Sequence, residues 1–167
     1  MSRAFFETVD DALHGFLPPG LRDFDSHRTS MNLKVWYEEG REHYEVQLVS
    51  GPALEVGFHA EHKDAVRNDD VLSRLVDGEK RWRKALGRAP ETGAFLGRQK
   101  NWRRISEVWD GEGLTEDAAI EAAERLAGYV EALEPLRRGA RPRRSAPTNK
   151  AQAAKARRRP RARNDSR

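Results

Sequence analysis

The side chains best suited to chemistry lie in one stretch, His43 to His62, with the sequence HYEVQLVSGPALEVGFHAEH. Carboxylates and imidazoles on one face of a sheet can bind Mg²⁺, Mn²⁺ or Zn²⁺, or can divide the roles of general acid and general base. The candidates for such a site are Glu45, Glu55, His59 and Glu61, with His43 and His62 at the ends of the stretch.

The same residues are also typical of a solvent-exposed sheet face, where acids and histidines are ordinary. None of their spacings is diagnostic of a metal site, so we expect a solvated face with no bound metal or cofactor. A shallow binding surface without chemistry is a third interpretation. His59 and Glu61 have the His-x-Glu spacing of zinc deaminases, but such sites also need cysteines, and the chain has none.

Alternation with a period of two predicts that this stretch forms two strands joined by a turn at residues 50–52. One side of the hairpin is apolar and is expected to face the core: Tyr44, Val46, Leu48, Leu54, Val56, Phe58 and Ala60. The other side carries Glu45, Gln47, Glu55, Gly57, His59 and Glu61.

Apolar residues spaced three to four apart predict helices over residues 2–17, 64–86 and 115–134. Gly78 is a point where the second helix is expected to kink or split. Pro135 is expected to end the third helix, because proline disfavours helical geometry at the residue before it.

Further strands are predicted over residues 32–38 and 101–109, the second with a helical alternative. Residues 20–30 and 88–98 are expected to be irregular, apart from a short extended piece at 94–96. The elements predict an α+β fold: a three- or four-stranded antiparallel sheet with helices on one face, in the order helix, three strands, helix, optional strand, helix.

This domain is expected to cover residues 1–138. Residues 139–167 are rich in Arg and Lys and contain no aliphatic side chain larger than alanine. Such a segment cannot bury enough apolar area to offset the entropy of ordering, so we expect a disordered tail.

Three stretches resemble a family of small uncharacterised bacterial proteins: LEVGFHAEH, WRKALG and LAGYVEALEPL. Residues 32–136 are also similar, in pattern and element order, to a domain of unknown function found beside restriction-endonuclease-like nucleases. The resemblance implies the α+β fold and a nucleic-acid context. It implies no catalytic residue, and the Glu/Asp-x-Lys strand motif of those nucleases has no clear counterpart in this chain.

Charge is divided unevenly along the chain. Residues 137–167 contain 13 Lys/Arg and one acid, a net charge of +12, whereas residues 1–136 contain 18 Lys/Arg and 26 acids, a net charge of −8. A flexible cationic arm can neutralise phosphates without reading sequence, so the tail is predicted to bind DNA or RNA. It can also be a solubilising extension, or an arm that lies on the acidic body.

A second cationic cluster lies between Lys80 and Arg104, where Trp82 and Trp102 stand among the cations. Basic residues interleaved with aromatic ones can hold phosphates and stack on bases, although the helical spacing of Trp82 favours a place in the core. The candidate nucleic-acid contacts of both segments are Lys80, Arg81, Arg83, Lys84, Arg98, Lys100, Arg103, Arg104, Arg141, Arg143, Arg144, Lys150, Lys155, Arg157, Arg158, Arg159, Arg161 and Arg163.

We therefore predict a non-enzymatic, nucleic-acid-associated or accessory protein, whose acidic body binds a partner and whose tail binds DNA or RNA. The alternatives are a metal-dependent hydrolase or nuclease that uses the polar face of the hairpin, and a protein–protein adaptor.

Several function classes are excluded or disfavoured by the sequence. The absence of cysteine excludes disulfides, thiolate metal sites and a cysteine nucleophile, and neither a P-loop nor a Gly-x-Ser-x-Gly motif is present. The N-terminal stretch has acids within it, unlike a secretory signal, and no run approaches the ~20 apolar residues of a membrane span. We expect a cytoplasmic protein without membrane contact.

Overall fold

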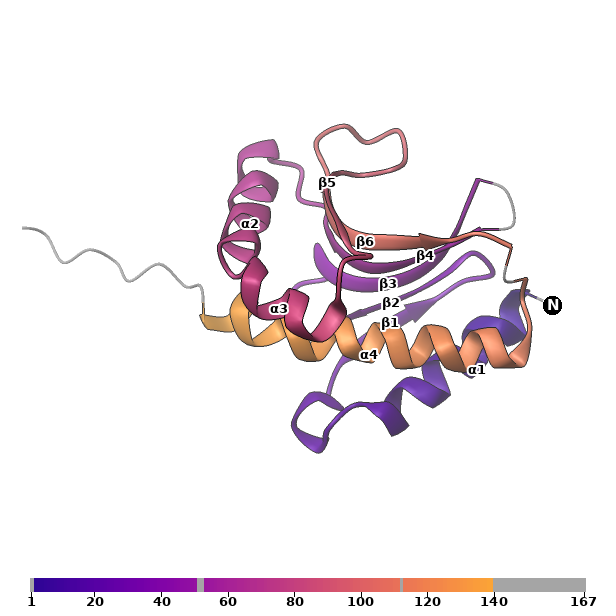
Figure 1. Ribbon diagram of the computed structural model, residues 1–167. Helices are drawn as coiled ribbons and strands as arrows, with labels where there is room; N and C mark the ends of the chain where they lie inside the picture. The colour runs from indigo at the N-terminus through magenta and orange to yellow at the C-terminus, as the bar shows by residue number, and fades with distance from the viewer. Residues whose placement is uncertain (1, 51–52, 112, 140–167) are drawn as a thin grey trace, which may run out of the picture.

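The computed structural model describes residues 2–50, 53–111 and 113–139, and confirms the α+β class (Figure 1). The helices are α1 (Ser2–Phe16), α2 (Ala65–Asp77), α3 (Glu79–Leu86) and α4 (Glu116–Gly139), with a short 3-10 turn, η1, at Pro19–Leu21. The strands are β1 (Asp25–Arg28), β2 (Asn32–Trp36), β3 (Glu42–Val49), β4 (Ala53–Ala60), β5 (Glu91–Ala94) and β6 (Arg103–Trp109).

The predicted hairpin forms the centre of the sheet. Its strands, β3 and β4, lie between β2 and β6 in the order β1-β2-β3-β4-β6-β5, and all neighbours are antiparallel. The register pairs His43 with His59 across the hairpin, and Lys34 of β2 with Glu45 of β3. Polar side chains from adjacent strands are thereby brought onto one face of the sheet.

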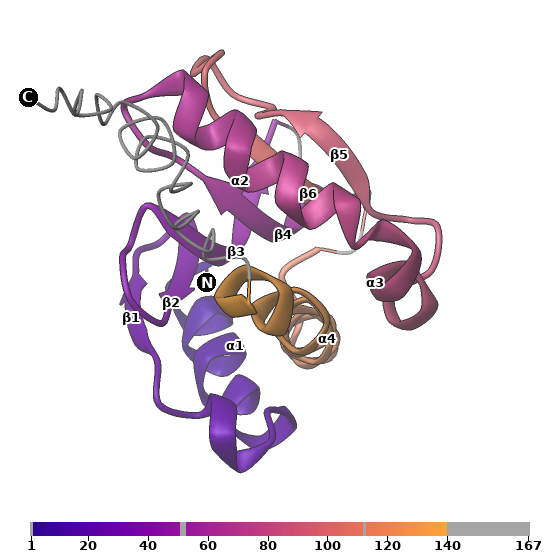
Figure 2. The ribbon, with the colours of Figure 1, turned by 90° about the vertical axis from the view of Figure 1, so that its left-hand side faces the viewer.

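The helices cover the opposite face, as predicted. Helices α1 and α4 lie side by side under the β2–β4 part of the sheet, while α2 and α3 lie towards β6 and β5 (Figures 1 and 2). The apolar side of the hairpin packs into this helical layer, and Tyr44, Val46, Val56 and Phe58 are each at most 1% exposed. Trp82 of α3 is 1% exposed and lies in the same core, which confirms its predicted place.

The predicted number of strands is wrong, because the described part of the chain forms a sheet of six. Sequence reasoning missed β1 altogether and placed the short extended piece at 94–96, whereas β5 covers Glu91–Ala94. Both are four-residue edge strands, and every residue of β1 is exposed. A strand whose side chains are nearly all exposed has no apolar face to bury, so its side chains carry no alternating pattern.

The second predicted helix behaves as expected at Gly78, whereas the third extends past its predicted end. The segment 64–86 splits at Gly78 into α2 and α3, one of the two outcomes expected there. The prediction that Pro135 ends the last helix is wrong, since α4 continues to Gly139. Its last turn is fixed by Glu134, whose carboxylate accepts hydrogen bonds of 2.8 Å from both Arg137 and Arg138. These bonds offset the hydrogen bond that proline cannot donate.

The predicted tail, apart from its first residue Gly139, lies outside the described residues. Within the described part, no helix combines the length and the apolar character that crossing a bilayer requires.

Candidate metal centre

The candidate residues of the hairpin are buried, so the expectation of a solvated face is wrong. His43, Glu55 and His59 are 0% exposed, Glu45 is 1% exposed and Glu61, which follows β4, is 7% exposed. These side chains cover one another, and the ring of Phe95 from the β5–β6 connection packs edge-on against His59 at 5.3 Å. The alternation correctly separated the two faces, but the second face is a buried polar layer.

A glycine leaves the space in which this layer forms. Gly57 lies opposite Glu45 in the hairpin register and opposite Ser106 of β6. A Cβ atom at this position would collide with the Ile105 carbonyl oxygen and with Ser106. Because Gly57 has no side chain, Glu45 can reach across to His59, which lies diagonally from it.

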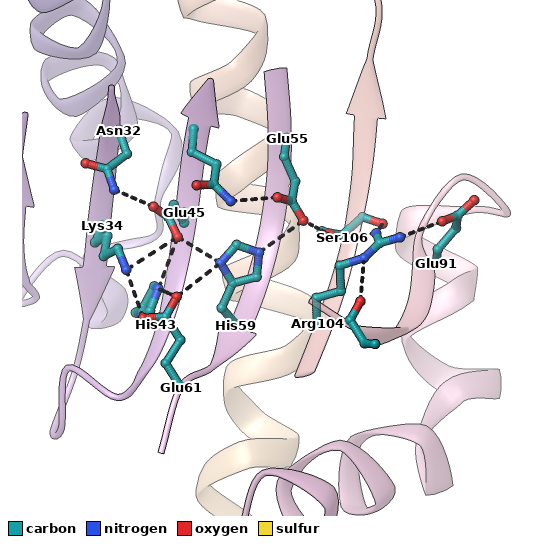
Figure 3. Close-up of polar contacts among 12 residues, drawn as sticks. Asn32, Lys34, His43, Glu45, Glu55, His59, Glu61, Glu91, Arg104 and Ser106 are labelled. Carbon is teal, nitrogen blue, oxygen red and sulfur yellow. Dashed lines mark hydrogen bonds and ion pairs between the residues drawn. The ribbon is translucent and has the colours of Figure 1, made fainter. Parts of the chain in front are cut away.

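His59 lies between two carboxylates. Its Nδ1 is 2.8 Å from Glu45 Oε2 and its Nε2 is 3.1 Å from Glu55 Oε1 (Figure 3). Burial alone would lower the pKa of His59, but its hydrogen bonds to Glu45 and Glu55 outweigh burial and raise the pKa to about 9. The same contacts lower the pKa of both glutamates against the opposing effect of burial. Without an ion, His59 is therefore an imidazolium that donates to both carboxylates.

His43 is in a different state. Its Nδ1 is 2.9 Å from the carbonyl oxygen of Gly40, which can only accept, so Nδ1 carries the proton. Burial lowers the pKa of His43, although the hydrogen bond that a protonated ring would donate to Glu45 opposes this. In the neutral ring, the lone pair of Nε2 points at Glu45 Oε2 from 3.2 Å. Two acceptors thus face each other in the metal-free cluster.

Four donor atoms converge beside this contact: His43 Nε2, Glu45 Oε2, His59 Nδ1 and Glu61 Oε1. All lie within 4.8 Å of one another. The distances from His43 Nε2 to Glu45 and Glu61 are 3.2 and 3.6 Å, and those from His59 Nδ1 are 2.8 and 4.0 Å. Ligands about 2.0–2.1 Å from a tetrahedral Zn²⁺ stand roughly 3.3 Å apart. The four histidine–glutamate distances scatter around this spacing, so the donors could close on one zinc ion through small side-chain movements.

Each of the two carboxylate ligands is held by its other oxygen. Glu45 Oε1 accepts a hydrogen bond of 2.6 Å from Asn32, and Glu61 Oε2 accepts one of 3.0 Å from Lys34. The two imidazoles are held at their far nitrogens by Glu55 and the Gly40 carbonyl. The partners behind Glu45, His43 and His59 resemble the usual second layer of a metal site, where such partners fix ligand orientation.

The polar layer continues across β6 to the edge strand β5 (Figure 3). Ser106 donates to Glu55, Arg104 donates to Ser106, and Arg104 also pairs with Glu91 at 2.7 Å. Ser106 is 0% exposed and bonds to a carboxylate rather than to an imidazole. It therefore does not have the setting of a serine nucleophile.

Comparison of the chain with protein-family models, curated proteins and solved structures finds no match. The resemblance of residues 54–62, 82–87 and 126–136 to a family of uncharacterised bacterial proteins accordingly stays a prediction. So does the resemblance of residues 32–136 to a domain of unknown function found beside nucleases. What the chain can do has to be argued from its own geometry.

Not every candidate of the hairpin joins the cluster. His62 is buried, but its Nε2 bonds to Glu42 at 2.8 Å and its backbone N–H donates to Asn68. Conversely, sequence reasoning missed Asn32 and Lys34. A signal for Lys34 was available, since it lies on the polar side of β2 and a short connection to β3 places it opposite Glu45.

The candidate nucleic-acid contacts in the described part are divided between the two faces of the sheet. Lys80, Arg81 and Lys84 are exposed on α3, whereas Arg83 bonds to Glu79 of the same helix. The other four belong to the β5–β6 hairpin: Arg98 and Lys100 are exposed, Arg103 bonds to Asp69, and Arg104 is 6% exposed. The candidates from Arg141 to Arg163 lie outside the described residues.

Proposed function

We propose that this protein binds one divalent transition-metal ion, of the zinc class, through His43, Glu45, His59 and Glu61. The observation that carries the proposal is the convergence of these four donor atoms, two imidazole nitrogens and two carboxylate oxygens, within 4.8 Å of one another. The partners behind His43, Glu45 and His59 support it.

The donor set favours Zn²⁺ over the hard cations. Imidazole nitrogens suit zinc, copper, iron and nickel, whereas Mg²⁺ and Ca²⁺ prefer oxygen ligands. Ca²⁺ also takes six to eight ligands, more than the four donors present in the cluster.

The charges of the cluster also favour a divalent ion. Glu45, Glu55 and Glu61 are balanced by Lys34 and by a protonated His59, which leaves one negative charge inside a layer that water barely reaches. A divalent ion can supply the two positive charges that Lys34 and the His59 Nδ1 proton otherwise provide. Buried charge is tolerated only when it is compensated, and such an ion provides the compensation.

A closed set of four protein ligands is typical of structural or regulatory zinc, whereas catalytic zinc keeps one position open for water. A groove of about 550 Å³ does lie on the same sheet face, beside the β3–β4 turn. It is lined by residues such as Gln47, Phe95 and Val108 and by none of the four ligands. We therefore favour ion binding without hydrolysis over the metal-dependent hydrolase or nuclease.

The test is a titration of the chelator-treated full chain with Zn²⁺ and with Co²⁺, by calorimetry and by the visible absorption of tetrahedral Co²⁺. We expect one ion per chain. His43→Ala should weaken binding by more than about tenfold, the loss already expected for an outer partner. His62→Ala removes a buried histidine outside the cluster and should leave binding unchanged. No uptake by the wild type, or equal loss in both variants, would refute the proposal.

A second function, association with DNA or RNA, is supported by the exposed cations of α3. Lys80, Arg81 and Lys84 lie on a helix whose apolar side is anchored by Trp82. Together with the net charge of +12 in residues 137–167, they give the chain two cationic segments that can neutralise phosphates. Salt-dependent binding of duplex and single-stranded probes tests this function, as developed in the Discussion.

A further inference from the structure

Lys34 shares two of the proposed metal ligands. Its Nζ is 3.0 Å from Glu61 Oε2 and 3.7 Å from Glu45 Oε2, the oxygen that also faces both histidines. The Lys34 side chain is 25% exposed, more than any of the four ligands, so it lies between the cluster and solvent. The ammonium group thus occupies the most open side of the site.

We infer that Lys34 is a resident cation that the metal ion displaces, so that metal binding releases the Lys34 ammonium from the cluster to solvent. This inference rests on the proposed metal site and adds to it how the site is regulated. An ion on Glu45 Oε2 and Glu61 Oε1 neutralises the carboxylates that hold Lys34, and its two charges repel the ammonium at close range. A long flexible lysine can turn outward while its stem stays on the sheet.

Lys34 also gives the cluster a cation of its own. Many small zinc domains unfold when the metal is removed, because their ligands have no other partner. Here Lys34 pairs with Glu61 and Glu45, and Asn32 donates to Glu45. The metal-free cluster is held by its own cations, so ion binding can be reversible in a folded protein. Exchange of one cation for another is the behaviour of a regulatory site rather than of an obligatory structural one.

The side of Lys34 is also the route by which an ion reaches the ligands. Phe95 covers His59 from the side of β5 and β6, and Trp102 packs against Phe95 at 5.2 Å. On the side of β2, the partly exposed Lys34 lies against both Glu45 and Glu61. An entering ion would therefore meet Lys34 first and displace it.

Amine-reactive footprinting of the full chain, read by mass spectrometry, tests the inference. On saturation with Zn²⁺, acylation of Lys34 should rise about fourfold, because a side chain now 25% exposed becomes fully exposed. Lys63 is exposed already and lies two residues after Glu61, so its labelling should not change. If zinc binds and Lys34 labelling stays constant, the inference is wrong while the metal site stands.

Affinity gives a second, independent measurement. Lys34→Met removes the competing charge and should tighten Zn²⁺ binding by about tenfold or more, whereas Lys63→Met should not. Lys34→Gln keeps a hydrogen-bond donor for Glu61 without the charge, and it should also bind Zn²⁺ more tightly. This second variant tests the inference even if the methionine variant fails to fold. Equal or weaker binding by both folded variants overturns the inference. Absence of binding in the wild type and in both variants refutes the metal site itself.

Discussion

The substitution Glu45→Gln tests whether the polar layer is a network of compensated charges. Glu45 is 1% exposed, and its carboxylate lies 2.8 Å from His59, 2.6 Å from Asn32 and 3.7 Å from Lys34. Glutamine keeps the shape of the side chain and removes its charge. In the metal-free protein this leaves His59 with one carboxylate, Glu55, and Lys34 with Glu61 alone.

The expected cost follows from these contacts. Removing one partner of a buried ion pair costs about 3–5 kcal/mol. Because Glu55 still compensates His59 and Glu61 still compensates Lys34, we expect the lower end of this range, about 3 kcal/mol. For a domain of this size each kcal/mol shifts Tm by about 2–4 °C, so the variant should melt roughly 6–12 °C lower.

The measurement is urea and thermal unfolding followed by circular dichroism in the presence of a chelator. The matched control is Glu39→Gln, which removes the same charge from an exposed pair: Glu39 and Arg67 lie 2.7 Å apart, and their side chains are 51% and 52% exposed. Such pairs contribute about 0–1 kcal/mol. If Glu45→Gln costs no more than this control, the cluster does not hold compensated buried charge, and the electrostatic basis of the metal site is refuted.

Three further predictions concern other parts of the molecule. Gly57→Ala should destabilise the protein by about 1–3 kcal/mol in urea melts, because its Cβ would collide with β6, whereas Gly15→Ala on open helix surface should not destabilise it. Arg125 and Tyr129 lower the pKa of Glu107 against the opposing effect of burial. The stability that this shift contributes is present above the ordinary glutamate pKa and is lost as the pH falls below it. The variant Glu107→Gln should therefore lose less stability than the wild type between about pH 5 and 3. Deletion of residues 140–167 should weaken binding of DNA and RNA probes by more than about tenfold at low salt and reduce its salt dependence; unchanged binding in a gel-shift assay would move the contact to α3.

Side-chain alternation was enough to predict the centre of the fold. Tyr44, Val46, Val56 and Phe58 all lie in the core as their period-two spacing requires. Edge strands were beyond this reasoning, because the exposed residues of β1 have no face to bury and therefore no periodic pattern. At Pro135 the prediction was wrong for the opposite reason. A local rule predicted a helix end, but Glu134 is held by Tyr44 of β3 and by Arg137 of the next helical turn, and the helix continues.

The sequence predicted which residues form the candidate site, but it did not predict that they are buried. The period-two alternation placed Glu45, His59 and Glu61 on one face of the sheet, and their side chains do converge. Whether such a face is wet depends on neighbours that are distant in sequence, such as Phe95 from the β5–β6 connection. His62 was a candidate that does not join the cluster. Strand β4 ends at Ala60, and the His62 side chain pairs with Glu42 instead.

The strongest reason to assign chemistry to this layer is that it is a poor way to gain stability. Well-packed apolar residues in place of a buried ion pair are often neutral or stabilising. The contact between His43 Nε2 and Glu45 Oε2, at 3.2 Å, is unfavourable in itself while His43 is neutral, because both atoms are acceptors. A purely structural network would place a donor there, as it does between Asn32 and Glu45. A cation bound by both atoms turns the same contact into coordination, and this is why we assign the face to metal binding rather than to folding alone.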